Sequence, residues 1–316
     1  MPSFPPRLHV LLARDAPRGV VLRRGPSGQV CAIGWDRDRD RFTVGQWLRG
    51  RIYERRSDLS PDGVHLIYFA MNGHWKGRAR GSWTAISRAP WLTALTLYAK
   101  GDCWNGGGLF LSSREYWLND GYGHERLEDA SGLRRQDTRP WPGSYGGECP
   151  GVYYLRLQRD GWRFRPELTR SSRSSTVDVF ERDLRGGWIL RKYADGTVGP
   201  PPGRGVYGEC HVLEHGERRI VEDHPDWEWA DLERARLVWA AAGKLWTGTP
   251  GKDGLRDARV LHDFDGMTFE RLEAPYPRPA PVVRAALTET PAPEPPARPR
   301  KAARKRRASK GRRGSK

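Results

Sequence analysis

The chain has 316 residues, a net charge of +17 and a hydrophobic fraction of 37%. This length fits one large β domain or two ordinary domains, and the hydrophobic fraction lies above that of intrinsically disordered proteins. No run of about 18 apolar residues occurs, which excludes a membrane-spanning helix, and the 14 Trp, 11 Tyr and 8 Phe predict an aromatic core.

The N-terminal region predicts an antiparallel meander. Four short apolar segments follow one another closely: LHVLLAR (8–14), GVVLRRG (19–25), QVCAIGW (29–35) and RFTVGQWL (41–48). The loops between them are rich in turn-forming residues and are too short for the crossovers that parallel strands require. We therefore expect four strands in series, the content of one propeller blade or of half a barrel.

The loop DRDRD (36–40) offers three carboxylates at alternate positions, as a calcium-binding loop does. An EF-hand would place Gly sixth and Glu twelfth, whereas this chain has Arg41 and Trp47 there. The alternating arginines would also repel a cation. The stretch therefore predicts a solvated hairpin loop.

One motif recurs along the chain: an apolar run, then an alanine, a glycine and usually a tryptophan. Continuous apolar runs are typical of strands that are covered on both faces. The following Trp75, Trp104 and Trp246 are expected to anchor the strand ends. The copies are LIYFAMNG (66–73), LTLYAKG (95–101), LVWAAAG (237–243) and the weaker WILRKYADG (188–196).

The spacing of these copies suggests a structural repeat. Ala194 and Ala240 are 46 residues apart, and Ala99 and Ala194 are 95 apart, with VYYLRLQRDGW (152–162) as a predicted strand near the midpoint. A period of about 40 to 50 residues is the size of a four-stranded propeller blade. The first interval, from Ala70 to Ala99, is only 29 residues. Chance recurrence of strand-plus-glycine patterns in an all-β protein is the alternative.

The first copy follows SDLSPDG (57–63), in which Ser60, Pro61, Asp62 and Gly63 form a turn signal. This stretch resembles the SPDG-type repeat of the TolB and WD40-like β-propellers. The resemblance implies an all-β, β-propeller-like fold with about five or six four-stranded antiparallel blades. The segment 229–246 has some helical character, but its alignment with the other copies predicts strands.

The stretch GSYGG (143–147), with Ser144 as a possible catalytic serine, looks like the nucleophile elbow of prolyl-oligopeptidase-like hydrolases. That elbow has the pattern G-x-S-x-G between a strand and a helix. Here Pro142 replaces the first glycine of the pattern around Ser144, and the following residues read as a strand. A glycine-rich loop is the preferred interpretation.

A zinc site could be imagined from YGGECPG (145–151) and YGECHVL (207–213). Two cysteines and two histidines make a tetrahedral ligand set, but these lack the short spacing that pre-organises structural zinc sites. We therefore expect no metal and no other cofactor. The residues concerned are Cys149, Cys210, His211 and His215.

The acidic and aromatic stretch EDHPDWEWADLE (222–233) could contact a basic partner. Trp227 and Trp229 would share one face if this were a strand, because side chains alternate. Such a pair belongs more often to a core than to a recognition surface. Glycan binding by exposed Trp remains an alternative.

The C-terminal region differs from the rest of the chain. We expect a folded domain over 1–275, a proline-rich linker over 276–297 and a disordered basic tail over 298–316. The tail has no acidic residue, whereas the other 297 residues carry 44 basic and 38 acidic groups. Its eleven basic residues are Arg298, Arg300, Lys301, Arg304, Lys305, Arg306, Arg307, Lys310, Arg312, Arg313 and Lys316.

Such a tail predicts sequence-independent binding to nucleic acid, because cations that neutralise phosphates release counterions. A tail that only improves solubility is the alternative. The leading hypothesis is therefore a non-catalytic, propeller-like interaction module that the tail tethers to nucleic acid. A protein partner could bind a face of the propeller, and we expect a monomer without membrane contact.

The alternatives are a hydrolase or lyase in the central funnel and a glycan-binding propeller. An enzyme would draw its catalysts from scattered loop residues, and the funnel chemistry would decide between enzyme and binding module. The widely spaced cysteines and the absence of a convincing export signal favour a reducing, cytoplasmic location. The loop residues considered are Asp62, His74, Asp102, Glu148 and Glu209.

Overall fold

The structure is a computed structural model that describes residues 4–25, 28–139, 141, 145, 149–172, 176–198 and 207–279. Residues 1–282 form one compact unit. Its strands form five sheets in which almost every neighbouring pair is antiparallel, so the all-β prediction is confirmed. The exception is a parallel pair between β10 (Glu115–Leu118) and β12 (Arg134–Gln136).

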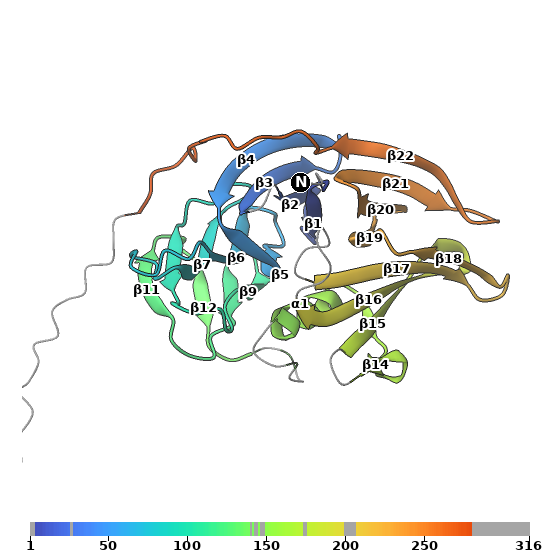
Figure 1. Ribbon diagram of the computed structural model, residues 1–316, viewed down its shortest axis with the longest axis horizontal. Helices are drawn as coiled ribbons and strands as arrows, with labels where there is room; N and C mark the ends of the chain where they lie inside the picture. The colour runs from blue at the N-terminus through green and yellow to red at the C-terminus, as the bar shows by residue number, and fades with distance from the viewer. Residues whose placement is uncertain are drawn as a thin grey trace, which may run out of the picture. The chain divides into compact units, whose positions relative to one another are not determined.

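The first sheet is the predicted N-terminal meander (Figure 1). Its strands pair in chain order: β1 (Arg7–Leu12), β2 (Arg18–Arg24), β3 (Gln29–Asp36) and β4 (Arg41–Arg49). The DRDRD stretch forms the predicted hairpin loop between β3 and β4. Two of its carboxylates cross to the fifth sheet, where Asp38 pairs with Arg234 and Asp40 with Arg236.

The second and third sheets share the next part of the chain. In spatial order, the second sheet consists of β5 (Arg51–Leu59), β6 (His65–Met71), β7 (Ser82–Arg88), β8 (Thr96–Ala99) and β11 (Glu125–Asp129). The third consists of β9 (Gly108–Ser112), β10 (Glu115–Leu118) and β12 (Arg134–Gln136).

The remaining two sheets follow a helix, α1 (Cys149–Arg159). The fourth sheet contains β13 (Arg163–Phe164), β14 (Arg170–Ser171), β15 (Thr176–Asp183), β16 (Trp188–Val198), β17 (Tyr207–His215) and β18 (Ile220–His224), with two short 3₁₀ helices at Pro166–Leu168 and Arg185–Gly187. The fifth contains β19 (Trp229–Glu233), β20 (Arg236–Ala241), β21 (Lys244–Pro250) and β22 (Leu255–Asp263).

The helix α1 corrects the prediction of a strand over 152–162. Its sequence, CPGVYYLRLQR, suits a strand because of its aromatic and branched residues, but seven consecutive residues from Gly151 to Leu157 are buried. It packs against β5, β9 and β13, so tertiary contacts override the local preference. Gly161, with φ +95°, follows the helix in the left-handed conformation that commonly ends helices.

The repeated apolar motif does not mark successive sheets throughout. LIYFA lies in β6 and LTLYA in β8, and both strands belong to the second sheet. This explains the 29-residue interval: it spans β7 and its connections to β6 and β8 within one sheet rather than one repeat. The segment 229–246 does form strands, as its alignment with the other copies predicted.

The predicted aromatic anchors divide into two classes. Trp75 and Trp104 are 54% and 56% exposed, so the expectation that they anchor strand ends is wrong. Trp246 instead stacks on Trp239. Trp227 and Trp229 are both buried, but they belong to different hydrophobic clusters, and only Trp229 lies within a strand. Much of the core is aromatic, as predicted.

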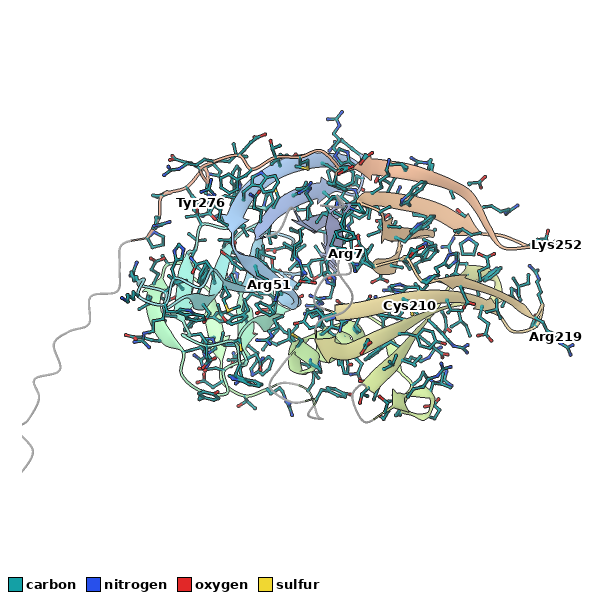
Figure 2. The ribbon with its side chains drawn as sticks, viewed as in Figure 1. Arg7, Arg51, Cys210, Arg219, Lys252 and Tyr276 are labelled. Carbon is teal, nitrogen blue, oxygen red and sulfur yellow. The ribbon has the colours of Figure 1, made fainter. Side chains whose placement is uncertain are left out.

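The first strands of four sheets contact one another: β1 contacts β5 and β19, and β5 contacts β9. The fourth sheet contacts β19 through β17. The last strands, β4, β18 and β22, have mostly exposed or half-exposed residues. Figure 2 shows Arg219 and Lys252 at the tips of two hairpins, and Arg218 Nη1 joins these hairpins by donating to Lys252 O at 2.8 Å.

The SPDG stretch forms a tight turn between β5 and β6. Ser60 Oγ donates to Asp62 Oδ1 at 2.5 Å and accepts the backbone N–H groups of Val64 and His65. Gly63 completes the turn with φ +71°, and a Cβ there would lie 2.6 Å from Arg18 Cβ. Both the backbone conformation and the space therefore require glycine.

We predict that Gly63→Ala lowers the free energy of unfolding more than Gly73→Ala does. Gly73 has nearly the same φ of +73°, but nothing lies within 4 Å of its added Cβ. The control should therefore cost only about 1–2 kcal/mol for the left-handed conformation. Urea denaturation of both variants measures the difference, and equal losses would show that the contact with Arg18 is unimportant.

Candidate functional site

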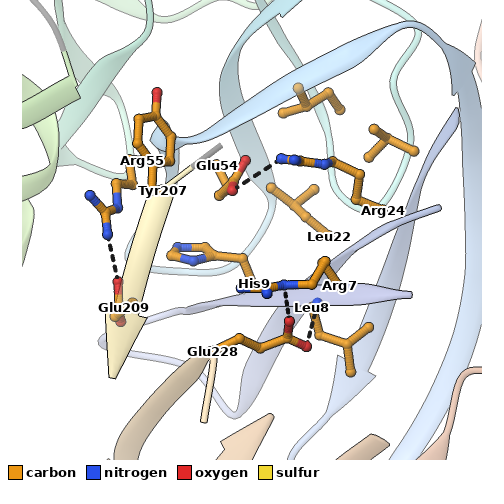
Figure 3. A pocket seen from close by; sticks show the side chains of 12 residues that line it. Arg7, Leu8, His9, Leu22, Arg24, Glu54, Arg55, Tyr207, Glu209 and Glu228 are labelled. Atoms are coloured by element: carbon orange, nitrogen blue, oxygen red, sulfur yellow. Dashed lines mark hydrogen bonds and ion pairs between the residues drawn. The ribbon is translucent and has the colours of Figure 1, made fainter. Parts of the chain in front are cut away.

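A layer of buried polar side chains lies between two cavities at the centre of the unit. The smaller cavity has a volume of about 30 Å³ and is shown in Figure 3. The larger has a volume of about 690 Å³ and is bounded by the segment Val10–Pro17, α1, β16 and β19. We call the layer the central polar layer; it consists of His9, Arg55, Tyr153, Arg156, Lys192, Glu209 and His211.

Glu209, from β17, is the acceptor on which this layer converges. Its Oε2 accepts from Arg55 Nη2 at 3.1 Å and from Tyr153 Oη at 2.9 Å, and its Oε1 pairs with Lys192 Nζ. Burial raises the pKa of a carboxyl, but the charges of Lys192 and Arg55 outweigh this effect. The pKa of Glu209 is therefore held well below its ordinary value.

The two histidines of the layer are held neutral. Arg156 Nη2 donates to His9 Nε2 at 2.8 Å, and Lys192 Nζ lies 3.1 Å from His211 Nε2, so a cation occupies the acceptor side of each ring. Burial and the neighbouring cation both lower the pKa of His9, and the same two causes lower that of His211. Neither imidazole carries a charge at neutral pH.

Two further clusters surround the layer. Arg159, at the end of α1, lies between two carboxylates: its Nη1 is 2.6 Å from Asp58 Oδ2, and its Nε is 2.8 Å from Asp160 Oδ1. At the start of α1, Cys149 Sγ accepts from Arg56 Nε at 3.0 Å and contacts Tyr207 Oη. Burial raises the pKa of the Cys149 thiol, which therefore stays protonated.

A carboxyl group with a raised pKa, that of Glu228, lies in the wall of the small cavity. Glu228 pairs with Arg7 and accepts the backbone N–H of Leu8 at 2.9 Å (Figure 3). Nearby, Glu54 lies 3.4 Å from Arg24. Burial is the main cause that raises the pKa of Glu228 to about 7, and the negative charge of Glu54 acts in the same direction.

The structure places the residues named from the sequence in very different surroundings. Of the five possible catalytic residues, Glu209 is at the centre. Asp62 lies in the SPDG turn, Asp102 pairs with Lys100 in a loop, and His74 is exposed. Glu148, Ser144 and all eleven basic residues of the tail lie outside the described residues.

The imagined zinc ligands do not come together as a set. His211 belongs to the central polar layer, Cys149 contacts Arg56, and the ring of His215 packs edge-on against Trp188. Among the described residues, no group of three or more His, Cys, Asp or Glu side chains could hold a metal ion. The four cysteines, all of which are described, form no disulfide.

Sequence reasoning missed most of the central polar layer, although a signal was present. His9 and Lys192 are polar or charged residues inside strands whose other residues are largely apolar, whereas Arg55 lies in the mostly polar stretch RIYERRSDL. A polar side chain that is buried at such a position needs a hydrogen-bond or ion-pair partner within the protein, because burial without one costs free energy. Arg156 was missed because its segment was predicted to be a strand, whereas it forms the helix α1.

No protein-family model, curated protein or solved structure matches the chain. Within the described residues, no helix combines the length and the apolar character that a membrane span requires.

We predict that Glu209→Gln is strongly destabilising, because it leaves Arg55 and Lys192 buried without a counter-charge. The free energy of unfolding should fall by about 3–5 kcal/mol. Adding Lys192→Met should recover part of this loss, since one uncompensated charge is removed. The exposed pair Arg163–Asp183 provides the control: Asp183→Asn should cost under about 1 kcal/mol. A similar small loss for Glu209→Gln would contradict the described pairing.

We predict that Glu228 makes stability fall as the pH rises from about 4.5 to about 7. In this window the unfolded chain has released the proton of Glu228, whereas the folded protein still holds it. The contribution is about 3 kcal/mol. In Glu228→Gln this component should vanish, while the exposed Glu217→Gln should keep it. Urea denaturation across the pH series tests this, and identical slopes in all three proteins would refute it.

Proposed function

We propose that the folded part of the chain is a β-propeller-like, non-catalytic interaction module and that residues 298–316 tether it to nucleic acid. The propeller proposal is supported by five sheets, because the first strands of four of them, β1, β5, β9 and β19, form a chain of contacts, and the fourth sheet joins this chain through β17. Exposed outer strands and a cavity at the centre agree with the same architecture. One sheet would then correspond to one blade.

The tether proposal is carried by one observation, the separation of charge along the chain. Eleven basic residues and no acidic residue lie in the last 19 positions, whereas the rest of the chain is nearly balanced. Within the described residues, many arginines of the body are already paired with carboxylates, as Arg159 is with Asp58. The tail therefore provides an excess of positive charge that attracts phosphates.

The hydrogen bonds already made by the carboxylate and the histidines of the central polar layer favour a binding role over catalysis. Glu209 already accepts three hydrogen bonds, and both histidines of the layer are engaged by cations. A general base needs a free acceptor within reach of a substrate proton. The hydrolase or lyase alternative draws support from the convergence of Glu209, His9 and His211 in the central polar layer.

Glycan binding is the second candidate, and one specific observation favours it. Trp75 and Trp104 expose more than half of their surface in loops that follow β6 and β8 of the second sheet.

The absence of any disulfide among the cysteines agrees with the proposed reducing, cytoplasmic location.

We predict that replacing all eleven basic residues of the tail by Gln abolishes measurable affinity for nucleic acid. Fluorescence anisotropy with labelled duplex DNA and single-stranded RNA across a salt series measures this. In the wild type, the logarithm of the binding constant should fall linearly with the logarithm of salt concentration, by about 0.9 per phosphate neutralised on duplex DNA.

A variant with the same tail residues in scrambled order is the matched control. It should bind like the wild type, because charge and not sequence carries the affinity. Unchanged affinity of the Gln-substituted protein would assign nucleic-acid binding to the folded body and overturn the tether.

A further inference from the structure

The larger cavity has the size and wall chemistry of a small-molecule site. Its volume of about 690 Å³ falls within the range of about 300–1,000 Å³ that is typical of ligand pockets. Seven Lys or Arg and four Asp residues line it. None of the described lining residues is a Ser, Thr, Cys, His or Glu. The wall therefore favours binding of an anion.

Most acidic residues of the cavity wall form ion pairs with arginines. Asp58 and Asp160 bracket Arg159, and Asp231 pairs with Arg182. Asp15 is exposed. Outside the wall, Lys192 pairs with Glu209, Arg37 with Glu233 and Arg234 with Asp38, so Arg14 and Arg156 carry the positive charge that no described carboxylate pairs with.

Arg156 is the clearest part of this positive charge. The residue is 5% exposed, and no carboxylate of the described residues lies within ion-pair distance of it. Its Nη1 donates to the carbonyls of Glu54 and Ser57, and its Nη2 donates to His9. The guanidinium has five N–H donors, so its Nε–H and one Nη2–H are left without a partner among the described residues.

Other cations extend the same site. Lys192 also lines the cavity, with Nζ 4.9 Å from the centre of the Trp162 ring. Arg14 is exposed on the same cavity wall, and the described residues provide no ion-pair partner for it. Leu11, Trp162 and Trp229 supply apolar wall. The cavity thus combines buried cations, an exposed cation and an apolar surface.

We propose that this cavity binds a small molecule with a phosphate or carboxylate group, which accepts the free N–H groups of Arg156. An oxyanion suits the planar guanidinium because two oxygens can accept from adjacent donors. It would also compensate a buried charge that is otherwise costly. The apolar wall accommodates an organic part of the ligand, so an organic phosphate or carboxylate fills the cavity better than a free ion. This inference does not depend on the tail.

Isothermal titration calorimetry on the full-length chain tests the proposal with inorganic phosphate, AMP, benzoate and the uncharged adenosine. The experiment is repeated with the Gln-substituted tail, which excludes binding by the tail. We expect saturable binding of at least one anionic probe and none of adenosine. Tighter binding of AMP or benzoate than of phosphate would identify an organic ligand, and the reverse order would identify the free ion.

Arg156→Gln should weaken the binding of the anionic probe at least about tenfold, because a charge-assisted hydrogen-bonding site is lost. Since this residue is buried, Arg14→Glu serves as a second variant at an exposed position, with an expected loss of roughly threefold that grows at low salt. The exposed Arg185→Gln, which does not line the cavity, is the control and should bind like the wild type. The proposal is overturned if no anionic probe binds at millimolar concentrations, or if binding is lost with the tail charges. It is also overturned if folded Arg156→Gln and Arg14→Glu both bind like the wild type.

Discussion

The structure depends on one buried carboxylate, that of Glu209. Arg55 reaches it from β5, Tyr153 from α1 and Lys192 from β16, so a single acceptor joins the second sheet, the helix and the fourth sheet. Burying Arg55 or Lys192 without this carboxylate would cost free energy, because hydrogen bonds to carbonyl groups alone do not offset the removal of a charge from water. Breaking this set of contacts therefore weakens the packing of all three elements.

The same layer separates two spaces with different chemistry. On one side, the small cavity has Arg7, Glu54 and Glu228 in its wall, and its charges are nearly matched. On the other side, the large cavity has an excess of basic residues. Arg156 and His9 connect the two sides, because the guanidinium borders the large cavity while its imidazole partner borders the small one. An anion bound in the large cavity would act directly on the packing of the layer.

The sequence predicted those parts of the fold that local patterns determine. The N-terminal meander follows from apolar segments separated by turn formers, and the SPDG turn follows from side chains that bond to their own backbone. The helix α1 could not be predicted in this way, because VYYLRL satisfies a strand pattern and only its contacts with β5 and β9 decide the outcome. The predicted repeat is not observed at LTLYA, because β8 joins the second sheet and does not begin a new one.

The candidate site was less predictable than the fold. His211 attracted notice as part of an imagined metal site, and Glu209 as one of five possible catalytic loop residues. Their actual partners, Arg55 and Lys192, lie 154 and 17 residues from Glu209 in the chain, and no local pattern reports such pairing. The basic tail is different in kind, since its charge is a property of composition alone.

The most direct test of this account is the titration of the Glu209 carboxyl group by ¹³C NMR, with Glu209→Gln to assign its resonance. The account predicts that this carboxyl stays ionised far below its ordinary pKa of 4.5 for as long as the protein remains folded, because Lys192 and Arg55 hold its charge. A carboxyl that titrates near 4.5 in the folded protein would contradict it, since the central cations would then have some other counter-charge.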